Sequence, residues 1–549
     1  MKNFIKQFSL QIIIILSIAV GLFVGVTMSR RATQQQFIEA LRSVAPNQQD
    51  SKVGAILSII DQLYVDPIQI DTLQEALIPK LMGMLDPHST YIPAKEFSRV
   101  NETLDGEFDG IGVVFNMATD TVIILNVINS GPSAKAGIMA RDRIVMINDT
   151  LVAGCKVPQD SIVSRLRGKR GTKVKLGIER VGVDELVDIE VTRGKIPINS
   201  IGASMMINNS VGYINMSQFA RTTYSEMINA VNRLLPEGMN SLILDLRGNS
   251  GGYMDQAIAV ATEFLPKKSL IVYTEDRDGK QVKEYTDRDG QLQNINLVVL
   301  IDEGSASSSE IVAGALQDND RGTIIGRRSF GKGLVQRQIQ LNDGSAVRIT
   351  TSRYFTPTGR SIQKPYEMGQ GEDYEHEILA RIEHEEIFSA DSIAFVDSLK
   401  FITPAGKVVY GGGGIMPDIF VPLSKEKLPA YFLEVSGKNI LYRYTIEYSD
   451  RHRDDLAAID SFEDLEAHFA ANPTLFDDFV RYAAKKGHKA SSGEINKSRE
   501  IIERQLRAFI GRNTALEDNG YYINMYPIDD TIMRALDELS KIPTDSLNL

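Results

Sequence analysis

The chain has 549 residues, of which 43% are apolar and 24% charged. This is the composition of a globular protein with about three or four domains. Acidic residues outnumber basic ones by 71 to 60, and the net charge of −11 argues against a protein that binds nucleic acid by neutralising phosphates. The single cysteine, Cys155, excludes an intramolecular disulfide and a cysteine-rich zinc site, and the sequence has no H-E-x-x-H motif.

The first 31 residues predict a segment that enters a membrane. Lys2 and Lys6 precede an apolar run from Leu10 to Met28, which as a helix would span roughly 28 Å, about the thickness of a bilayer's hydrocarbon core. We expect an uncleaved anchor, because the run is longer than most signal-peptide cores and no convincing A-x-A site follows it. The lysines favour a cytoplasmic N-terminus and a body outside the cytoplasm, periplasmic in a bacterium. The alternatives are a cleaved signal peptide with a secreted body, and a buried core helix.

Residues 32–105 are expected to be mostly helical. Two sets of apolar side chains recur at spacings of three and four residues: Val53, Ile56, Leu57, Ile60, Leu63 and Tyr64, and then Leu73, Leu77 and Leu81. Pro79 falls inside the second set and would remove a helical hydrogen bond. We therefore expect an interruption there and not one continuous helix.

Residues 106–197 predict a β-rich module, because short β-branched runs alternate with Gly and Asp. The module opens with Gly110, Ile111, Gly112 and Val113, a glycine-flanked turn before a strand. Free backbone N–H groups in such a turn can face an anion such as a peptide carboxylate.

Two later motifs in this module, GPSAKAGI at 131–138 and DRIVMIN at 142–148, complete an ordered set that resembles a PDZ domain. The resemblance implies that an extended C-terminus adds as a strand beside the Gly110–Val113 turn. A helix over Gln159–Leu166 would form the other wall of the groove. A β domain that binds nothing is the alternative.

Residues 198–425 alternate strands and helices, which predicts an α/β core. Buried strands are expected at 241–247 and 297–301, and helices at 253–265 and 307–317. Residues 366–390 are acidic and rich in turn formers, so we expect a solvated surface insertion. Its histidines, His376 and His384, receive no catalytic role.

Two motifs in this core compete to supply a nucleophilic serine. The first, GNSGG at 248–252, fits G-x-S-x-G in a strand-turn-helix context and names Ser250. A catalytic triad also needs a later histidine, and the later histidines lie in charged segments. The glycines Gly251 and Gly252 have a better use, because a glycine-rich turn at a helix start directs free N–H groups at a developing oxyanion.

The second motif is GSASSSE at 304–310, followed by FGKGLVQ at 330–336. A serine at a helix start, Ser307, lies where the helix dipole and free N–H groups favour negative charge. Lys332 can act as its base if burial lowers the lysine pKa. If the strand runs through Lys332, Gln336 falls on the same face and can orient the amine. A serine cluster that only caps the helix, with a surface lysine, is the alternative.

These two motifs and the later TSRYFTPTGRSIQ at 351–363 resemble the C-terminal processing, or tail-specific, serine peptidases. LDPHSTY at 85–91 and GIMPDI at 414–419 are also similar, so the resemblance covers about residues 50–425. It implies that Ser307 is the nucleophile, Lys332 the general base and Gln336 the residue that positions the lysine. The Ser308 N–H and the Gly251–Gly252 turn would form the oxyanion hole. The family often has proline where this chain has Ser250, and its core resembles the crotonase-like α/β fold.

The sequence therefore predicts five regions: a membrane segment at 1–31, a helical region at 32–105, a PDZ domain at 106–197, a peptidase core at 198–425 and a helical C-terminal domain at 426–549. The last packs on the core or on another subunit of a homo-oligomer. The predicted function is a serine endopeptidase that cuts protein substrates near their C-termini with a Ser/Lys dyad, without metal or organic cofactor. Its PDZ domain either recognises substrate tails or gates the site. A non-catalytic PDZ scaffold and a crotonase-type acyl-CoA enzyme are the alternatives.

Overall fold

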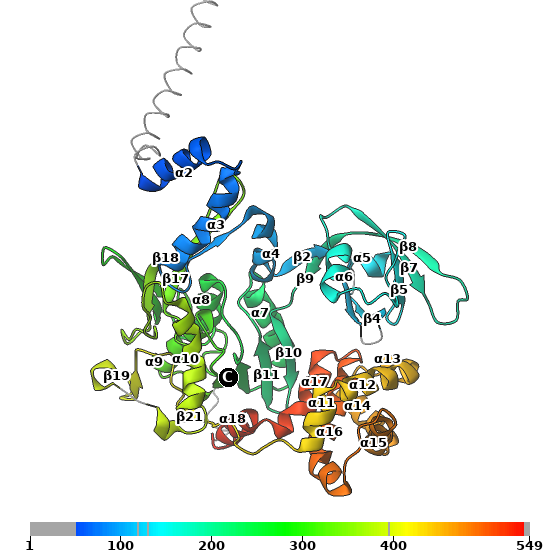
Figure 1. Ribbon diagram of the computed structural model, residues 1–549. Helices are drawn as coiled ribbons and strands as arrows, with labels where there is room; N and C mark the ends of the chain where they lie inside the picture. Colours follow the sequence, from blue (N-terminus) through cyan, green and yellow to red (C-terminus); the bar gives the residue numbers. More distant parts are fainter. Residues whose placement is uncertain (1–50, 118–119, 129–130, 394–395, 543–549) are drawn as a thin grey trace, which may run out of the picture. The chain divides into compact units, whose positions relative to one another are not determined.

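The computed structural model describes residues 51–117, 120–128, 131–393 and 396–542, and the chain divides into two compact units between Leu81 and Met82 (Figure 1). The predicted membrane segment at 1–31 lies outside the described residues. Over the described ranges, no helix combines the length and the apolar character needed to cross a bilayer.

The first unit contains the helix α2 (Lys52–Leu63) and most of α3 (Ile70–Gly83). The helix α2 begins after Ser51, whose side-chain oxygen accepts a hydrogen bond from the Gly54 N–H at 3.0 Å, as an N-cap residue does. The expected interruption at Pro79 is wrong, because α3 continues for four residues beyond it. A proline removes one backbone donor, and this helix runs through that loss.

The core of the second unit is a six-stranded sheet in the order β10-β11-β12-β15-β16-β21, parallel except for β10. Its strands are β10 (Ile201–Met206), β11 (Val211–Met216), β12 (Ser241–Asp245), β15 (Asn296–Ile301), β16 (Thr323–Gly326) and β21 (Ile419–Phe420). The helices α7 (Thr223–Leu234), α8 (Met254–Thr262) and α9 (Ser308–Asp318) pack on one face.

Both faces of this sheet are covered, as its continuous apolar strands require. Leu242 and Leu244 of β12 join the cluster that contains α7, α8 and α9, whereas Ile243 between them joins a second cluster with Ile532 and Leu539 of α18 (Asp530–Ser540). This alternation confirms the predicted α/β core.

A second sheet has the order β1-β18-β13-β14, with β17 also paired to β18. Its strands are β1 (Thr90–Ile92), β13 (Leu270–Asp276), β14 (Gln281–Tyr285), β17 (Leu334–Gln340) and β18 (Ala346–Phe355). The strand β1 and the helix α4 (Ala94–Asp105) precede the β-rich module in the chain, yet β1 is an integral part of this sheet. Near it, β19 (Lys400–Ile402) and β20 (Val408–Tyr410) form a small hairpin, and η1 (Ala390–Ser392) and η2 (Asp397–Leu399) are short 3-10 helices.

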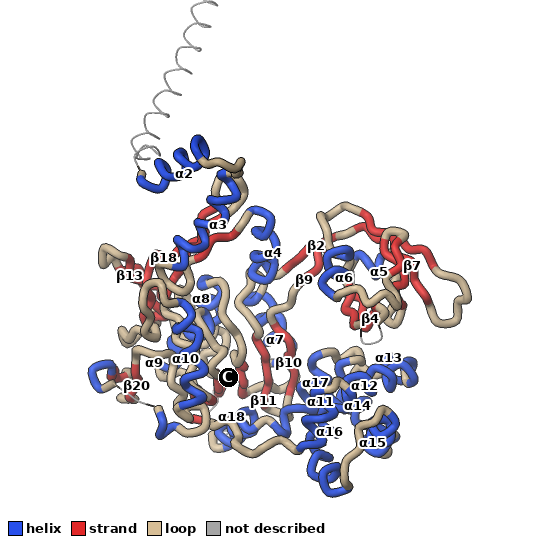
Figure 2. Tube along the Cα trace, in the orientation of Figure 1, coloured by secondary structure: helices blue, strands red, loops and turns tan. Residues whose placement is uncertain are grey.

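The β-rich module is a sheet in the order β3-β4-β5-β7-β8, with β6 paired to β5. Figure 2 draws its strands in red, with β4 and β7 labelled, and its helices α5 and α6 in blue. Its elements are β3 (Val113–Asn116), β4 (Val122–Val127), α5 (Pro132–Lys135), β5 (Arg143–Ile147), β6 (Thr150–Leu151), α6 (Gln159–Leu166), β7 (Lys173–Glu179) and β8 (Val187–Thr192). The strands β2 (Glu107–Gly110) and β9 (Gly194–Pro197) pair with each other and connect the module to the rest of the chain.

The C-terminal region is helical, as predicted. Its elements are α11 (Ala430–Gly437), α12 (Ile440–Arg451), α13 (Arg453–Ala457), α14 (Phe462–Ala471), α15 (Leu475–Lys485), α16 (Ser492–Arg512), α17 (Asp518–Met525), η3 (Tyr526–Ile528) and α18. Arg247 of the core forms ion pairs with Asp245 at 2.7 Å and with Asp529 at 3.0 Å, and Asp529 also caps α18. The last helix is therefore part of the core.

The acidic stretch at 366–390 is not a solvated insertion. It contains the helix α10 (Gly371–Glu383), in which Tyr374 and Arg381 are 4% and 2% exposed. The acidic composition suggested solvent exposure, but Glu377 forms ion pairs with Lys364, Arg328 and Arg381. The two histidines, His376 and His384, are exposed as expected.

Candidate active site

Ser307 lies at the start of α9 in a strained backbone conformation. Its φ is 54° and its ψ is −111°, a region that residues other than glycine rarely occupy. The side chain is partly exposed, whereas Ser308 and Ser309 behind it are buried. Ser308 is the first residue of the helix, where the backbone N–H has no acceptor within the helix.

The glycine-rich turn at 248–252 lies directly against the Ser307 turn. A side chain at Gly251 would place its Cβ 2.8 Å from the Ser307 Cβ, so only glycine fits there. The Ala306 N–H donates to the Asn249 carbonyl at 2.9 Å, and the Ser308 hydroxyl donates to the Gly252 carbonyl at 3.0 Å. Two segments about sixty residues apart thus form one wall of the site.

Of the two glycines predicted to stabilise an oxyanion, Gly251 has a donor that is already used, because its N–H donates to the Asn249 side chain at 2.9 Å. Gly252 differs. The Phe219 N–H donates to the Gly251 carbonyl, and the Phe219 carbonyl accepts from the Tyr253 N–H. Because the backbone groups of successive residues in an extended stretch alternate in direction, the Gly252 N–H and carbonyl point away from Phe219. That side faces Ser308, whose hydroxyl bonds to the Gly252 carbonyl.

Lys332, Gln336, Ser307 and both glycines line one cavity of about 900 Å³. The strand β17 begins at Leu334, after Lys332, and its pairing shifts register between Val335 and Gln336. The strand does not run through Lys332, so the condition for Lys332 and Gln336 to share a strand face is not met. Both nevertheless line the cavity, Lys332 from a loop and Gln336 from a bulged strand. The Gln336 side chain donates to the Thr350 hydroxyl at 3.1 Å.

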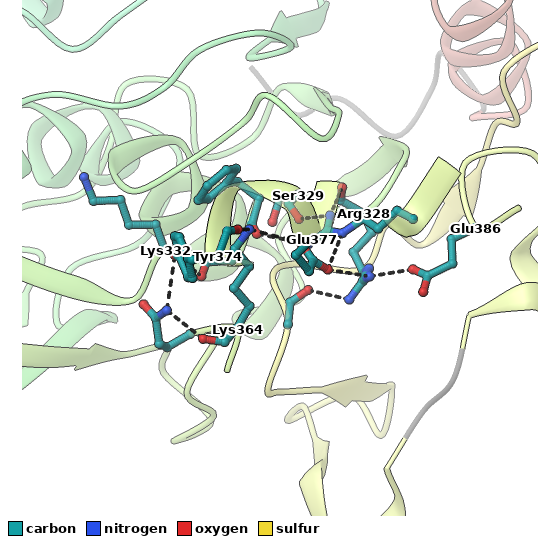
Figure 3. A network of polar contacts seen from close by, with 12 residues as sticks. Arg328, Ser329, Lys332, Lys364, Tyr374, Glu377 and Glu386 are labelled. Atoms are coloured by element: carbon teal, nitrogen blue, oxygen red, sulfur yellow. Dashed lines mark hydrogen bonds and ion pairs between the residues drawn. The ribbon is translucent and has the colours of Figure 1, made fainter. Parts of the chain in front are cut away.

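The Lys332 amine is suited to be a base. Burial and the positive charge of Arg348 lower the Lys332 pKa, against the weaker opposing effect of Glu310 and Asp86. Across the described residues, the amine forms no hydrogen bond or ion pair that would hold its proton, and Figure 3 shows it directed away from the neighbouring polar network.

Glu310 joins the serine turn to the lysine loop, a role that the sequence reading missed. The carboxylate is 0% exposed and accepts bonds from the Ser307 and Lys332 N–H groups at 2.8 and 2.9 Å. Its second oxygen accepts from the Ser329 hydroxyl at 2.6 Å and the Gly331 N–H at 2.7 Å. Burial raises the pKa of this carboxyl. The signal was available, since Ser307 and Glu310 have the S-x-x-E spacing of a capping box.

The helix α10 holds the lysine loop from its other side (Figure 3). Arg381 donates to the carbonyls of Ser329 and Phe330 at 2.8 and 3.0 Å. Glu377 binds Arg381 at 2.7 Å and Lys364 at 3.0 Å, and the Lys364 amine lies 4.0 Å from the centre of the Phe330 ring. The backbone next to Lys332 is therefore held by hydrogen bonds from Arg381, which is itself paired with Glu377.

His88, from the LDPHSTY motif, lines the same cavity. Its Nε2 is 3.1 Å from the Tyr374 hydroxyl, and burial together with the charge of Lys332 lowers its pKa to about 4. The imidazole is thus neutral at pH 7. In the same motif Asp86 accepts a bond from the Thr350 hydroxyl at 2.9 Å, which links the motif to Gln336.

Ser250 also lines the cavity, but nothing near it completes a triad. All six histidines are described, and His88 alone among them lines the cavity, with its Nε2 bonded to Tyr374. Among the described residues, therefore, no histidine is placed to complete a triad with Ser250.

The predicted peptide-binding residues lie in the β-rich module and do not line the cavity. Gly110 ends β2, Val113 begins β3, and Gly112 between them has a φ of 78°. Ile111 is 3% exposed and packs into the core of the module. The predicted helix at Gln159–Leu166 is observed as α6.

Comparison with known families agrees with this architecture. The sequence matches "Peptidase family S41" over residues 210–375, "PDZ domain" over 110–191, and a family of unknown function, DUF8443, over 431–515. The Carboxy-terminal-processing protease of Bartonella bacilliformis is 37% identical over 57% of this chain and 72% of its own length. The Carboxy-terminal processing protease CtpA of Bacillus subtilis is 34% identical over 57% of this chain and 67% of its own length.

Among solved structures, the photosystem II D1 C-terminal processing protease is 27% identical, covers 56% of this chain and 89% of its own, and has a TM-score of 0.32. The chain is a serine-type peptidase with a PDZ domain. It belongs to the carboxy-terminal processing proteases of peptidase family S41, which confirms the predicted family and favours a peptidase over a scaffold or an acyl-CoA enzyme.

Proposed function

We propose that this peptidase cuts protein substrates near their C-termini with Ser307 as nucleophile and Lys332 as general base. The observation that carries the proposal is the cavity that these residues share. It is lined by a strained serine at a helix start, by a lysine whose amine has no bonded partner in the described chain, and by two turns with backbone N–H groups. The lowered lysine pKa supplies the neutral amine that this chemistry needs.

In the proposed reaction the Ser307 hydroxyl attacks the peptide carbonyl while the Lys332 amine takes its proton. The tetrahedral intermediate then collapses, and the Lys332 ammonium donates that proton to the leaving amine. A water molecule, deprotonated by the same amine, attacks the acyl-enzyme. The ester bond to Ser307 breaks, and the lysine returns the proton to the serine oxygen.

We assign the oxyanion hole to the N–H groups of Ser308 and Gly252. The first is free because it opens α9, and the second faces the same turn. Gly251 has a steric role, since its lack of a side chain lets the two turns approach. Gln336 is assigned the positioning of the lysine through its place in the cavity and its bond to Thr350.

The PDZ domain, residues 106–197, is proposed to bind the substrate's C-terminus between α6 and the Gly110–Val113 turn. The names of the Bartonella and Bacillus relatives describe proteases that process carboxyl ends, which supports the same site of cleavage here. We also propose that residues 198–425 form most of a crotonase-like core, to which β1 and α18 are added from the mostly helical regions at 32–105 and 426–549. Residues 1–31 are proposed to anchor the body outside the cytoplasm.

The test is to incubate the protein with an unstructured protein substrate and to sequence the fragments. Ser307→Ala is expected to abolish cleavage, whereas Ser250→Ala, which changes an exposed side chain of the same cavity, retains at least part of it. Activity in Ser307→Ala together with its loss in Ser250→Ala would overturn the assignment.

A further inference from the structure

Arg348 is a charged residue of the cavity that the dyad chemistry does not use. It lies on β18, where it pairs with Gln338 of β17 on one side and with Thr90 of β1 on the other. All three residues line the cavity. Within the described residues the guanidinium donates one hydrogen bond, to the Gln338 side-chain oxygen at 2.9 Å. An arginine has five N–H donors, so most of its donors remain for a ligand.

The charge of Arg348 has no counterpart in the described part of the chain, where it forms no ion pair. The other arginine of the cavity, Arg221, is paired with Asp105 at 3.0 Å. The acidic residue of the lining, Asp255, is exposed, and its charge raises the pKa of Arg221. For Arg348, the neighbour whose charge opposes the lowering of the pKa by burial is Tyr253 and not a carboxylate. A half-buried arginine without a carboxylate is costly to desolvate unless a ligand supplies one.

Arg348 is also close to the reaction site. Gln336 pairs with Thr350, and Gln338 pairs with Arg348, so these four side chains share one face of the β17–β18 hairpin. The two pairs are two residues apart, or about 7 Å along the strand. This step corresponds to about two residues of an extended peptide, and Arg348 is near enough to Lys332 to lower the lysine pKa by charge repulsion.

We propose that Arg348 binds a carboxylate of the substrate within about three residues of the cut bond, and that it thereby helps to choose where the chain is cut. The planar guanidinium can hold a carboxylate through two parallel bonds, with Gln338 fixing its orientation. The carboxylate belongs either to an Asp or Glu side chain or to the C-terminus itself. This inference rests on the proposed function, since it assumes that the bond is cut in this cavity.

The experiment uses the intact protein and peptides copied from a cleavage site mapped in an unstructured protein. One series carries Asp or Asn at each of the three positions on either side of the cut, with an amidated C-terminus throughout. A second series ends one, two or three residues after the cut as the free acid or the amide. The readout is the ratio of kcat/KM between the two members of each pair.

The variants are Arg348→Gln and the matched control Arg337→Gln, which removes an exposed arginine of β17 that does not line the cavity. Wild type and Arg337→Gln are expected to favour the carboxylate at one position by about tenfold or more, as for a charge-assisted bond. In Arg348→Gln the Asp/Asn ratio falls to about one, and an acid/amide ratio falls to the part that PDZ binding contributes. The series that shows the loss identifies the source of the carboxylate.

Ratios within one variant cancel any change in the lysine pKa, because both members of a pair share it. The Asp/Asn pairs also share an amidated C-terminus and therefore the same PDZ binding, whereas the PDZ contribution to the acid/amide ratio is equal in every variant and cancels when variants are compared. If Arg348→Gln is poorly folded by thermal melting, Arg348→Lys keeps the charge without the fork and is expected to give an intermediate ratio. An unchanged ratio in either variant, or a wild type without preference at every position, overturns the proposal. Failure of the dyad appears separately, as cleavage by Ser307→Ala.

Discussion

Glu310→Gln is expected to damage the active site although it changes no group that touches the substrate. The carboxylate uses one oxygen for the Ser307 and Lys332 N–H groups and the other for Ser329 and Gly331. A glutamine has one acceptor oxygen and one N–H₂ donor. With the N–H₂ group toward Ser307 and Lys332, both N–H donors lose their acceptor. With it toward Ser329 and Gly331, the Gly331 N–H loses its acceptor, whereas the Ser329 hydroxyl can turn and accept.

The expected loss follows from the donors left without an acceptor. Each costs about 1–3 kcal/mol when buried, so the loss is about 1–3 kcal/mol for one donor and about 2–6 kcal/mol for two. The site can avoid this cost only by moving the Ser307 turn or the Lys332 loop. If this displacement raises the activation free energy by about 3 kcal/mol, kcat/KM falls by roughly 100-fold, since about 1.4 kcal/mol is a factor of ten.

The assay measures kcat/KM on a peptide substrate and the midpoint of urea unfolding for each variant. Glu226→Gln is the matched control, because Glu226 also accepts two backbone N–H bonds, from Ser200 and Ile201, but with a single oxygen. A glutamine can keep both bonds there, so its effect on either measurement is expected to be small. Wild-type activity and stability in Glu310→Gln would refute the reasoning.

Three further outcomes are expected. The wild-type kcat/KM rises with pH as Lys332 deprotonates, and the midpoint lies below the usual lysine pKa of about 10.4 because the Lys332 pKa is lowered. Lys332→Arg is expected to be nearly inactive, since the guanidinium remains protonated. Near wild-type turnover of Lys332→Arg contradicts the base role. His88 has a pKa of about 4 when folded and about 6.5 when unfolded, so the unfolded chain binds the extra proton first and the free energy of unfolding falls as the pH drops from 6.5 to 4. In His88→Gln the free energy of urea unfolding is expected to depend less on pH in that range. The same pH dependence in the variant and the wild type contradicts this prediction. Amidation of a substrate's C-terminus slows cleavage at substrate concentrations below saturation, and deletion of residues 106–197 removes the difference in rate between acid and amide. Equal rates for both peptides in the intact protein speak against tail recognition.

Local patterns predicted much of the fold. The strand at β12, the helix α6 and the start of α9 at Ser307 follow from apolar periodicity and helix-start residues, which act over a few positions. The motifs GSASSSE and FGKGLVQ, together with the resemblance to the tail-specific peptidases, named Ser307 and Lys332 as candidates, and both line the cavity.

What local patterns missed depends on contacts between distant segments. Composition made the 366–390 stretch look solvated, because it does not reveal that Arg381 reaches the carbonyls behind Lys332. The link from Lys332 to Gln336 was expected along one strand, but a bulge and a later strand start intervene. Arg348 is an ordinary strand residue in the sequence, and only the folded cavity reveals its unmatched charge.

The paired strands β2 and β9 have a consequence for how this chain can be rebuilt. Glu107 lies opposite Pro197, and the Ile198 N–H bonds to the Gly106 carbonyl at 2.8 Å, so the two ends of the PDZ domain are neighbours. Partners in such a ladder lie about 5 Å apart, a gap that a tight turn of two residues spans. The module can thus be excised, or exchanged for one with another tail preference, by joining two adjacent backbones. The remaining chain keeps its strand order, because no strand of the peptidase sheets comes from within residues 106–197.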